Sequence, residues 1–136
     1  MDLSMGLIRA DILMAKQGIE LFKERKIKEI KNTVAYHIQQ AAEKLIKIQI
    51  YRSGVPYSNS ALYIHNLSKL ISYAESIGVE LILPDEIREN ALMITDWESG
   101  SGYDLQFVVR IDTLEKYQKI VDEWFSELKI HGIGRS

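Results

Sequence analysis

Residues 34–48 constrain the fold of this chain more than any other stretch. Their apolar side chains recur at a spacing of three and four, which places them on one stripe of an α-helix. They are Val34, Ile38, Ala41, Leu45 and Ile48. Three polar residues, His37, Gln40 and Lys44, follow the same spacing and therefore line one flank of that helix. We predict a long core helix over residues 27–52 that carries this polar row beside its apolar stripe.

Composition excludes several classes of protein. With 136 residues the chain can bury a core as one domain, and without cysteine it can form neither disulfides nor thiolate zinc sites. Two prolines and eight glycines favour a few long helices over many short strands. Charged residues interrupt the apolar positions at the N-terminus, and no apolar run is long enough to span a bilayer. We expect a cytoplasmic protein without a membrane partner.

Four further helices are expected around the central one, near residues 4–24, 61–77, 84–97 and 112–128. Asn59 and Ser60 are good caps for the third helix, Pro84 suits the start of the fourth, and Asp112 with Glu115 resembles a capping box. The first helix should turn inward Leu7, Ile8, Ile12, Ala15, Ile19 and Phe22. The third should turn inward Leu62, His65 or Asn66, Leu67, Leu70, Ile71 and Ala74. The fourth should bury Ile87, Ala91, Ile94 and Trp97, and the last Leu114, Tyr117, Val121, Trp124 and Leu128. Because short connections make neighbouring helices alternate in direction, we predict an all-α, up-and-down antiparallel bundle of four to five helices.

One segment breaks the helical period. Apolar and polar residues alternate over residues 103–109, but no second strand signal accompanies them. We therefore expect an extended connector before the last helix, packed on the bundle or against a second subunit. The predicted organisation is a single helical domain over residues 1–132 followed by a frayed tail at 133–136.

Charge is distributed unevenly, although the net charge is only −2. Residues 16–52 contain nine Lys or Arg against four Asp or Glu, whereas residues 75–127 contain four against thirteen. This asymmetry would suit a basic surface for phosphates and an acidic one for a partner, or simply two solvated helix faces of opposite sign. The balance is unlike that of a dedicated duplex-DNA binder.

A family resemblance follows from several of these segments together. The run Tyr-His-Ile-Gln-Gln-Ala-Ala-Glu-Lys at residues 36–44, the His-Asn-Leu element at 65–67, and Gly-Tyr-Asp at 102–104 before a long helix resemble the HEPN family, the higher eukaryotes and prokaryotes nucleotide-binding domain. The resemblance implies a bundle of four or five helices, homodimerisation, and pairing with a minimal nucleotidyltransferase encoded nearby. It further implies a nucleotide ligand in some members and ribonuclease toxin activity in others.

Two departures from the family pattern bear on activity. The family commonly carries Arg-Tyr before its last helix, where this chain has Gly102 and Tyr103. The ribonuclease branch has an arginine followed after four to six residues by histidine, and none of the three histidines here has an arginine at that distance. Lysine at position 31, six before His37, is a poor replacement for a planar guanidinium. We therefore predict a protein that is not an RNA-cleaving enzyme, with RNA at most a weak partner.

Four residues of the predicted helices, together with Tyr103, are the candidate ligand contacts. His37, Gln40, Lys44 and His65 could line one groove for a nucleotide or another anion, or they could form a buried polar network that sets helix register. Gln39 and Glu43 could be a surface pair, or Glu43 could bond to Lys47. No set of residues has metal-ligand spacing and no glycine-rich phosphate loop occurs, so no metal or cofactor is predicted. The functional hypotheses are a non-catalytic HEPN-like protein of a toxin–antitoxin-like module, a ribonuclease toxin, and a purely structural scaffold.

Overall fold

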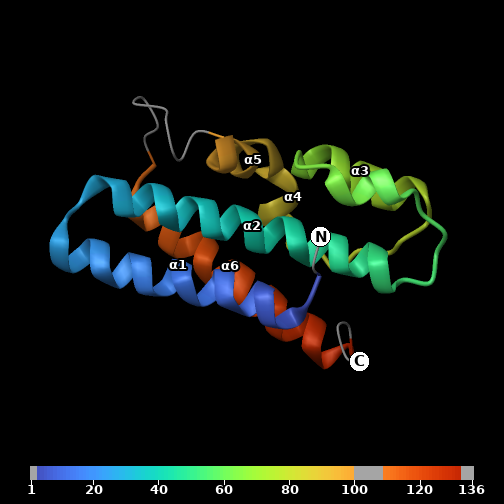
Figure 1. Cartoon of the computed structure of the whole chain (residues 1–136), viewed down its shortest axis with the longest axis horizontal. Coiled ribbons are helices and arrows are strands. Elements are labelled where there is room, and N and C mark those ends of the chain that lie inside the picture. Colours follow the sequence, from blue (N-terminus) through green and yellow to red (C-terminus); the bar gives the residue numbers. More distant parts are fainter. Residues whose placement is uncertain (1–2, 100–108, 133–136) are drawn as a thin grey trace.

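The computed structural model describes residues 3–99 and 109–132. Every regular element in these two ranges is helical (Figure 1). The elements are α1 (Met5–Arg25), α2 (Lys28–Arg52), the 3₁₀ helix η1 (Asn59–Tyr63), α3 (Leu67–Ser76), α4 (Asp85–Glu89), α5 (Ala91–Ser99) and α6 (Ile111–Ile130). The prediction of an all-α bundle is confirmed. No helix among the described residues has the length and apolar character that crossing a membrane requires.

Helix α2 is the central element, as its sequence predicts. It packs against α1, α3, α5 and α6, and α1 lies antiparallel beside it while α6 lies behind the pair (Figure 1). All five residues of the predicted apolar stripe are completely buried. The burial continues onto the opposite side of the helix at Ala42, Ile46 and Ile50, so α2 contributes to the core over most of its circumference.

Helix α1 follows its predicted stripe except at the two ends of that stripe, where Leu7 is exposed and Phe22 is only half-buried. Ser4 caps the helix by accepting a hydrogen bond from the Leu7 amide, and a left-handed Lys26 ends it. The buried side chains are those of Ile8, Ile12, Ala15 and Ile19, with Asp11 beside them. Leu7 is exposed, which corrects the prediction that it faces inward. It lies one residue, and thus about 100° of helix rotation, away from Ile8.

The predicted third helix is divided in two. The chain forms η1, breaks at residues 64–66, and only then begins α3. The cap of α3 is Asn66, whose side chain accepts a hydrogen bond from the Lys69 amide, while the Leu67 amide donates to Thr95 Oγ1 of α5. His65 therefore lies in the break before α3 and not on the inner face of a helix.

Helix α3 runs in the same direction as α2. Just before α3, His65 contacts Glu43 in the middle of α2, and beyond the end of α3 the Ile82 carbonyl accepts a hydrogen bond from Gln49, further along α2. The segment that contains η1 carries the chain back along α2, so the two helices do not alternate in direction as simple neighbours would.

The predicted fourth helix is likewise interrupted, at Asn90 between α4 and α5. The Asn90 side chain donates to the Glu86 carbonyl, and this local hydrogen bond accompanies the break in the helix. The apolar residues expected to face inward, Ile87, Ala91, Ile94 and Trp97, are all buried. The inward face was therefore predicted correctly although the continuity of the helix was not.

Helix α6 buries the whole stripe that its sequence predicts, namely Leu114, Tyr117, Val121, Trp124 and Leu128. The predicted capping box is wrong: Arg110 is the N-cap and makes no side-chain cap bond, while Glu115 pairs with Lys23 of α1. Of the predicted connector, Val109 is described; it is buried, and its carbonyl accepts from Lys31. Tyr103, the rest of the connector and the tail at 133–136 lie outside the described residues.

Candidate functional site: two polar networks on the central helix

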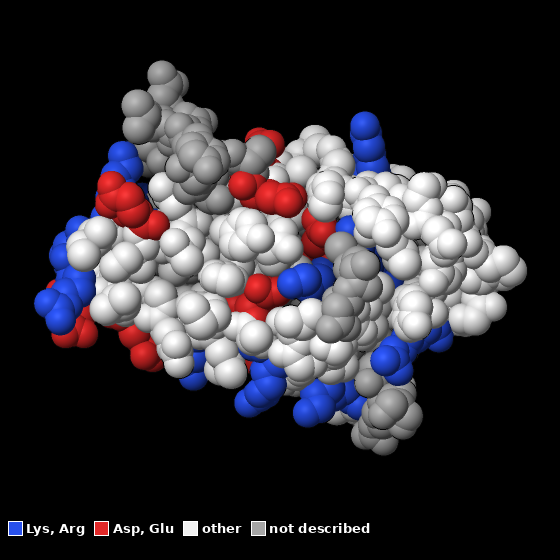
Figure 2. All heavy atoms as spheres, in the orientation of Figure 1, with Lys and Arg blue, Asp and Glu red and all other residues white. Residues whose placement is uncertain are grey.

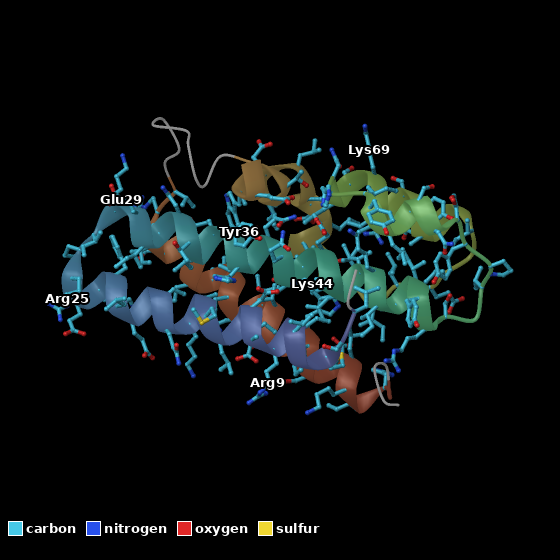
Figure 3. The ribbon with its side chains drawn as sticks, viewed as in Figure 1. Arg9, Arg25, Glu29, Tyr36, Lys44 and Lys69 are labelled. Carbon is cyan, nitrogen blue, oxygen red and sulfur yellow. The ribbon has the colours of Figure 1, made fainter. Side chains whose placement is uncertain are left out.

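The polar row of α2 meets a carboxylate from the neighbouring helix. Asp11 of α1 has one oxygen 2.9 Å from His37 Nδ1 and the other 2.7 Å from Lys44 Nζ, so it joins the two ends of the row. All three side chains are partly open to solvent, with exposed fractions of 20% for His37, 15% for Lys44 and 11% for Asp11. Figure 3 shows Lys44 on the part of α2 that runs beside α1. This group is called the α1-side network below.

Gln40, the middle residue of the row, forms its side-chain hydrogen bond with a different residue. Its amide donates to Gln39 Oε1 at 2.7 Å, and Gln39 in turn donates to Glu43 Oε1 at 3.0 Å. Gln40 therefore connects the row to a second group of polar side chains on α2. The three predicted residues share a flank, but they do not converge on one point.

The second group, called the α5-side network below, is centred on Glu43. Lys47 donates to Glu43 Oε2 at 2.9 Å, and the side chains of both residues are buried, with exposed fractions of 0% and 1%. Glu43 thus pairs with Lys47, as one of the two interpretations predicted. The other interpretation, a surface pair of Gln39 and Glu43, is wrong because both residues are buried where α5 packs on α2.

His65 belongs to the α5-side network. Its Nδ1 lies 3.2 Å from Glu43 Oε1 and 3.9 Å from Glu98 Oε2, and its side chain is 58% exposed. Burial raises the pKa of Glu98, and the negative charge of Glu43 raises it further. Because His65 contacts Glu43 and His37 contacts Asp11, the structure does not bring the two histidines into the single groove that the sequence suggested.

The HEPN domain family model matches residues 10–129, which is most of the chain and includes both networks. The chain belongs to the HEPN domain family. Neither the curated proteins nor the solved structures contain a significant match to it.

The HEPN chain holds its two central histidines in contact with acids. Asp11 orients His37 and Glu43 orients His65. A carboxylate at this distance opposes the approach of a phosphate by charge repulsion, and it offers none of the bidentate grip that a guanidinium provides.

Most of the basic side chains that could attract RNA have partners within the fold. These residues are Lys23, Arg25, Lys26, Lys28 and Lys31. Lys23 donates to Glu115 of α6 at 2.6 Å, and Lys31 donates to the Val109 carbonyl at 3.0 Å. The ammonium groups of Lys26 and Lys31 also lie over the Phe22 ring. The run thus ties the α1–α2 turn to α6 in addition to carrying charge.

The sequence analysis did not identify two acidic residues of the networks, Asp11 and Glu98, although their spacing indicates that each lies beside a buried face. Asp11 lies three residues after Ile8 and four before Ala15, so the helical period already places it beside the core. Glu98 lies four residues after Ile94 and one after Trp97, which puts it at the edge of another buried face. Which residues these acids would meet depends on helix packing and could not be inferred from spacing.

Proposed function

We propose that this HEPN protein is a non-catalytic binding module that acts as a homodimer and pairs with a minimal nucleotidyltransferase. The proposal that it does not cleave RNA is supported by the missing arginine-to-histidine spacing. A nuclease of this family type would need a histidine free to exchange protons beside a cation that orients phosphate.

An exposed apolar face supports the proposal that the module works through protein contacts. Leu7, Met14 and Leu21 recur every seven residues on α1, all are well exposed, and Tyr36 of α2 is exposed as well. In Figure 2 the face over α1, α2, α3 and α5 is largely uncharged, with acidic and basic groups adjoining each other near its middle. Exposed large apolar side chains in a row, on a face with few charges, are typical of protein interfaces.

The experiment that tests the dimer is light scattering after size exclusion at micromolar concentration. We expect the wild-type chain to elute as a dimer and the variant Met14→Lys to elute as a monomer, because a charge would be buried in the interface. Ile130→Lys is the matched control, since Ile130 is an exposed apolar residue that ends α6 and is not part of the row formed by Leu7, Met14 and Leu21. A monomeric wild type, or a Met14→Lys variant that stays dimeric, would contradict the proposal.

The partner is tested by co-purification. We expect a nucleotidyltransferase to be encoded beside this chain and to co-elute with it when the two are expressed together. Expression of the chain alone should cause neither growth arrest nor RNA cleavage. Growth arrest with RNA cleavage would support the ribonuclease toxin instead, and the absence of a complex would support the purely structural scaffold.

A nucleotide ligand would engage the α1-side network, where Lys44 and His37 are partly open to solvent. The nucleotide would have to displace Asp11, whose carboxylate already pairs with both His37 and Lys44. Thermal shift with a panel of nucleotides separates the two modes of binding: a shift that disappears in Lys44→Ala supports nucleotide binding, whereas no shift supports a module that binds protein alone.

A further inference from the structure

Three side chains from separate elements converge on one point at the surface of the α5-side network. They are Glu43 of α2, His65 from the break before α3, and Glu98 of α5, and one ligating atom of each lies within 4.8 Å of the others. We propose that these three residues bind a divalent transition-metal ion, for which Zn²⁺ is the probe that their chemistry favours. This site lies apart from the apolar face of α1 and goes beyond the function proposed above.

The distances fit such an ion with little adjustment. Bonds of about 2.1 Å in a tetrahedral arrangement separate neighbouring ligand atoms by about 3.4 Å. His65 Nδ1 lies 3.2 Å from Glu43 Oε1 and 3.9 Å from Glu98 Oε2. Because the side chains of His65 and Glu98 are partly exposed, small rotations can close the remaining gap, whereas the buried Glu43 stays in place.

The buried ligand is oriented by neighbours in the way that metal-binding carboxylates usually are. Gln39 donates to Glu43 Oε1 and Lys47 donates to Oε2, so the plane of the carboxylate is fixed before any ion binds. The other two ligands are tied together through the backbone, because the Leu67 amide next to the His65 loop donates to Thr95 Oγ1 on α5. The site is therefore pre-organised by contacts that do not include the proposed ion.

The charges around the site and its access to solvent also suit a divalent cation. Lys47 balances Glu43, and Glu98 brings a second carboxylate to within 3.9 Å of the same imidazole nitrogen of His65. A dication would offset the repulsion between the two acids. The exposed side of His65 provides a path for the ion and an open position for water, which suits a three-ligand site.

The donor set indicates which ions should bind. One imidazole nitrogen with two carboxylate oxygens suits Zn²⁺ and its transition-metal neighbours, whereas Mg²⁺ and Ca²⁺ prefer all-oxygen shells. Sequence spacing could not predict this set of ligands, because His65 lies 22 residues after Glu43 and 33 residues before Glu98. Only the packing of α5 and the His65 loop on α2 brings them together.

The test is calorimetric titration of the full, metal-stripped chain with ZnCl₂, supported by thermal shift with ZnCl₂ or MgCl₂. We expect one Zn²⁺ per chain, a higher melting temperature with Zn²⁺, and a much smaller change with Mg²⁺. His65→Ala and Glu98→Gln should each weaken Zn²⁺ binding by at least about tenfold. Both change partly exposed side chains, so they preserve the fold more safely than a change at buried Glu43.

The matched control is His131→Ala. It removes an exposed histidine at the end of α6 whose backbone amide donates to the Glu127 and Lys129 carbonyls, and Zn²⁺ affinity should be unchanged. An absent heat of binding, an equal response to Mg²⁺, or wild-type affinity in either His65→Ala or Glu98→Gln would overturn the proposal. Loss of Zn²⁺ affinity in both of those variants but not in His131→Ala would support it.

Discussion

Gly18 of α1 lies directly against Val34 of α2: a Cβ built on Gly18 would stand only 2.5 Å from Val34 Cγ2. Val34 is completely buried, and its β-branched side chain has little rotamer freedom in a helix. The close packing of α1 and α2 thus depends on the absence of a side chain at position 18. Glycine normally costs about 1 kcal/mol in a helix interior, but here it allows the two backbones to approach.

We predict that Gly18→Ala destabilises the protein despite alanine's better helix propensity. Overpacking typically costs about 1–3 kcal/mol, from which the gain in propensity of about 1 kcal/mol is subtracted. Urea denaturation would measure the change in the free energy of unfolding. Gly6→Ala is the control: position 6 is an exposed glycine of the same helix whose added Cβ would meet only Ser4 Oγ at 3.8 Å, so it should cause no loss.

The same contact predicts a rescue. In a Val34→Ala background the atom that clashes is gone, so Gly18→Ala should cost much less than it does in the wild-type chain. A double-mutant cycle isolates this interaction because the two residues touch directly. Equal costs of Gly18→Ala in both backgrounds would show that the packing of α1 on α2 does not depend on this pair.

We predict a large loss of stability for Lys47→Met. Glu43 would keep its negative charge in a buried position without its ammonium partner, and breaking a buried pair in this way typically costs about 3–5 kcal/mol. The double variant Glu43→Gln with Lys47→Met should lose less than Lys47→Met alone, because no uncompensated charge remains. Lys44→Met makes the same substitution at a partly exposed lysine and should cost less. Chemical denaturation at neutral pH would compare the free energies of unfolding of these three variants.

Much of the fold could be predicted from apolar spacing alone. The stripes of α2 and α6 are buried as expected, because each has an apolar residue every three or four positions over several turns. The breaks at residues 64–66 and at Asn90 could not be predicted in this way. Asn59 and Asn66 are equally good caps by sequence, and the choice between them is accompanied by a tertiary hydrogen bond between Leu67 and Thr95.

The candidate site was predictable only in part, for a related reason. Spacing along one helix correctly placed His37 and Lys44 on one flank, but it could not identify Asp11 as the carboxylate between them. The position of His65 depended on where α3 begins, so the error in that helix boundary became an error in the site. Contacts between elements follow from packing, and the sequence pattern of one element does not contain them.

We predict that Asp11 and His37 are energetically coupled. Asp11→Ala would leave Lys44 and His37 without their shared acceptor, and the loss of a partly buried charged hydrogen bond costs about 1–3 kcal/mol. His37→Ala alone should cost less, because Lys44 still pairs with Asp11. The cycle of the two single variants and the double variant, followed by urea denaturation, should give a coupling energy above about 0.5 kcal/mol. Strictly additive losses would show that the α1-side network does not act as a unit.

The last prediction concerns acid pH and the link between α3 and α4. Arg88 donates from two guanidinium nitrogens to the two oxygens of Glu75, at 3.1 and 2.7 Å. This hydrogen bonding lowers the pKa of Glu75 below its ordinary value of 4.5. A carboxyl whose pKa is lower in the folded state stabilises the fold at pH values above its unfolded pKa, and this contribution is lost as the pH falls through the folded value.

Glu75→Gln should therefore lower the melting temperature slightly at pH 7, since the pair is solvent-exposed, and the difference from wild type should shrink in acid. Arg88→Ala should show the same pH dependence because it removes the same pair. Melting temperatures measured across the acid range would reveal it, and a deficit in Glu75→Gln that stays constant down to acid pH would show that the ion pair is not its cause.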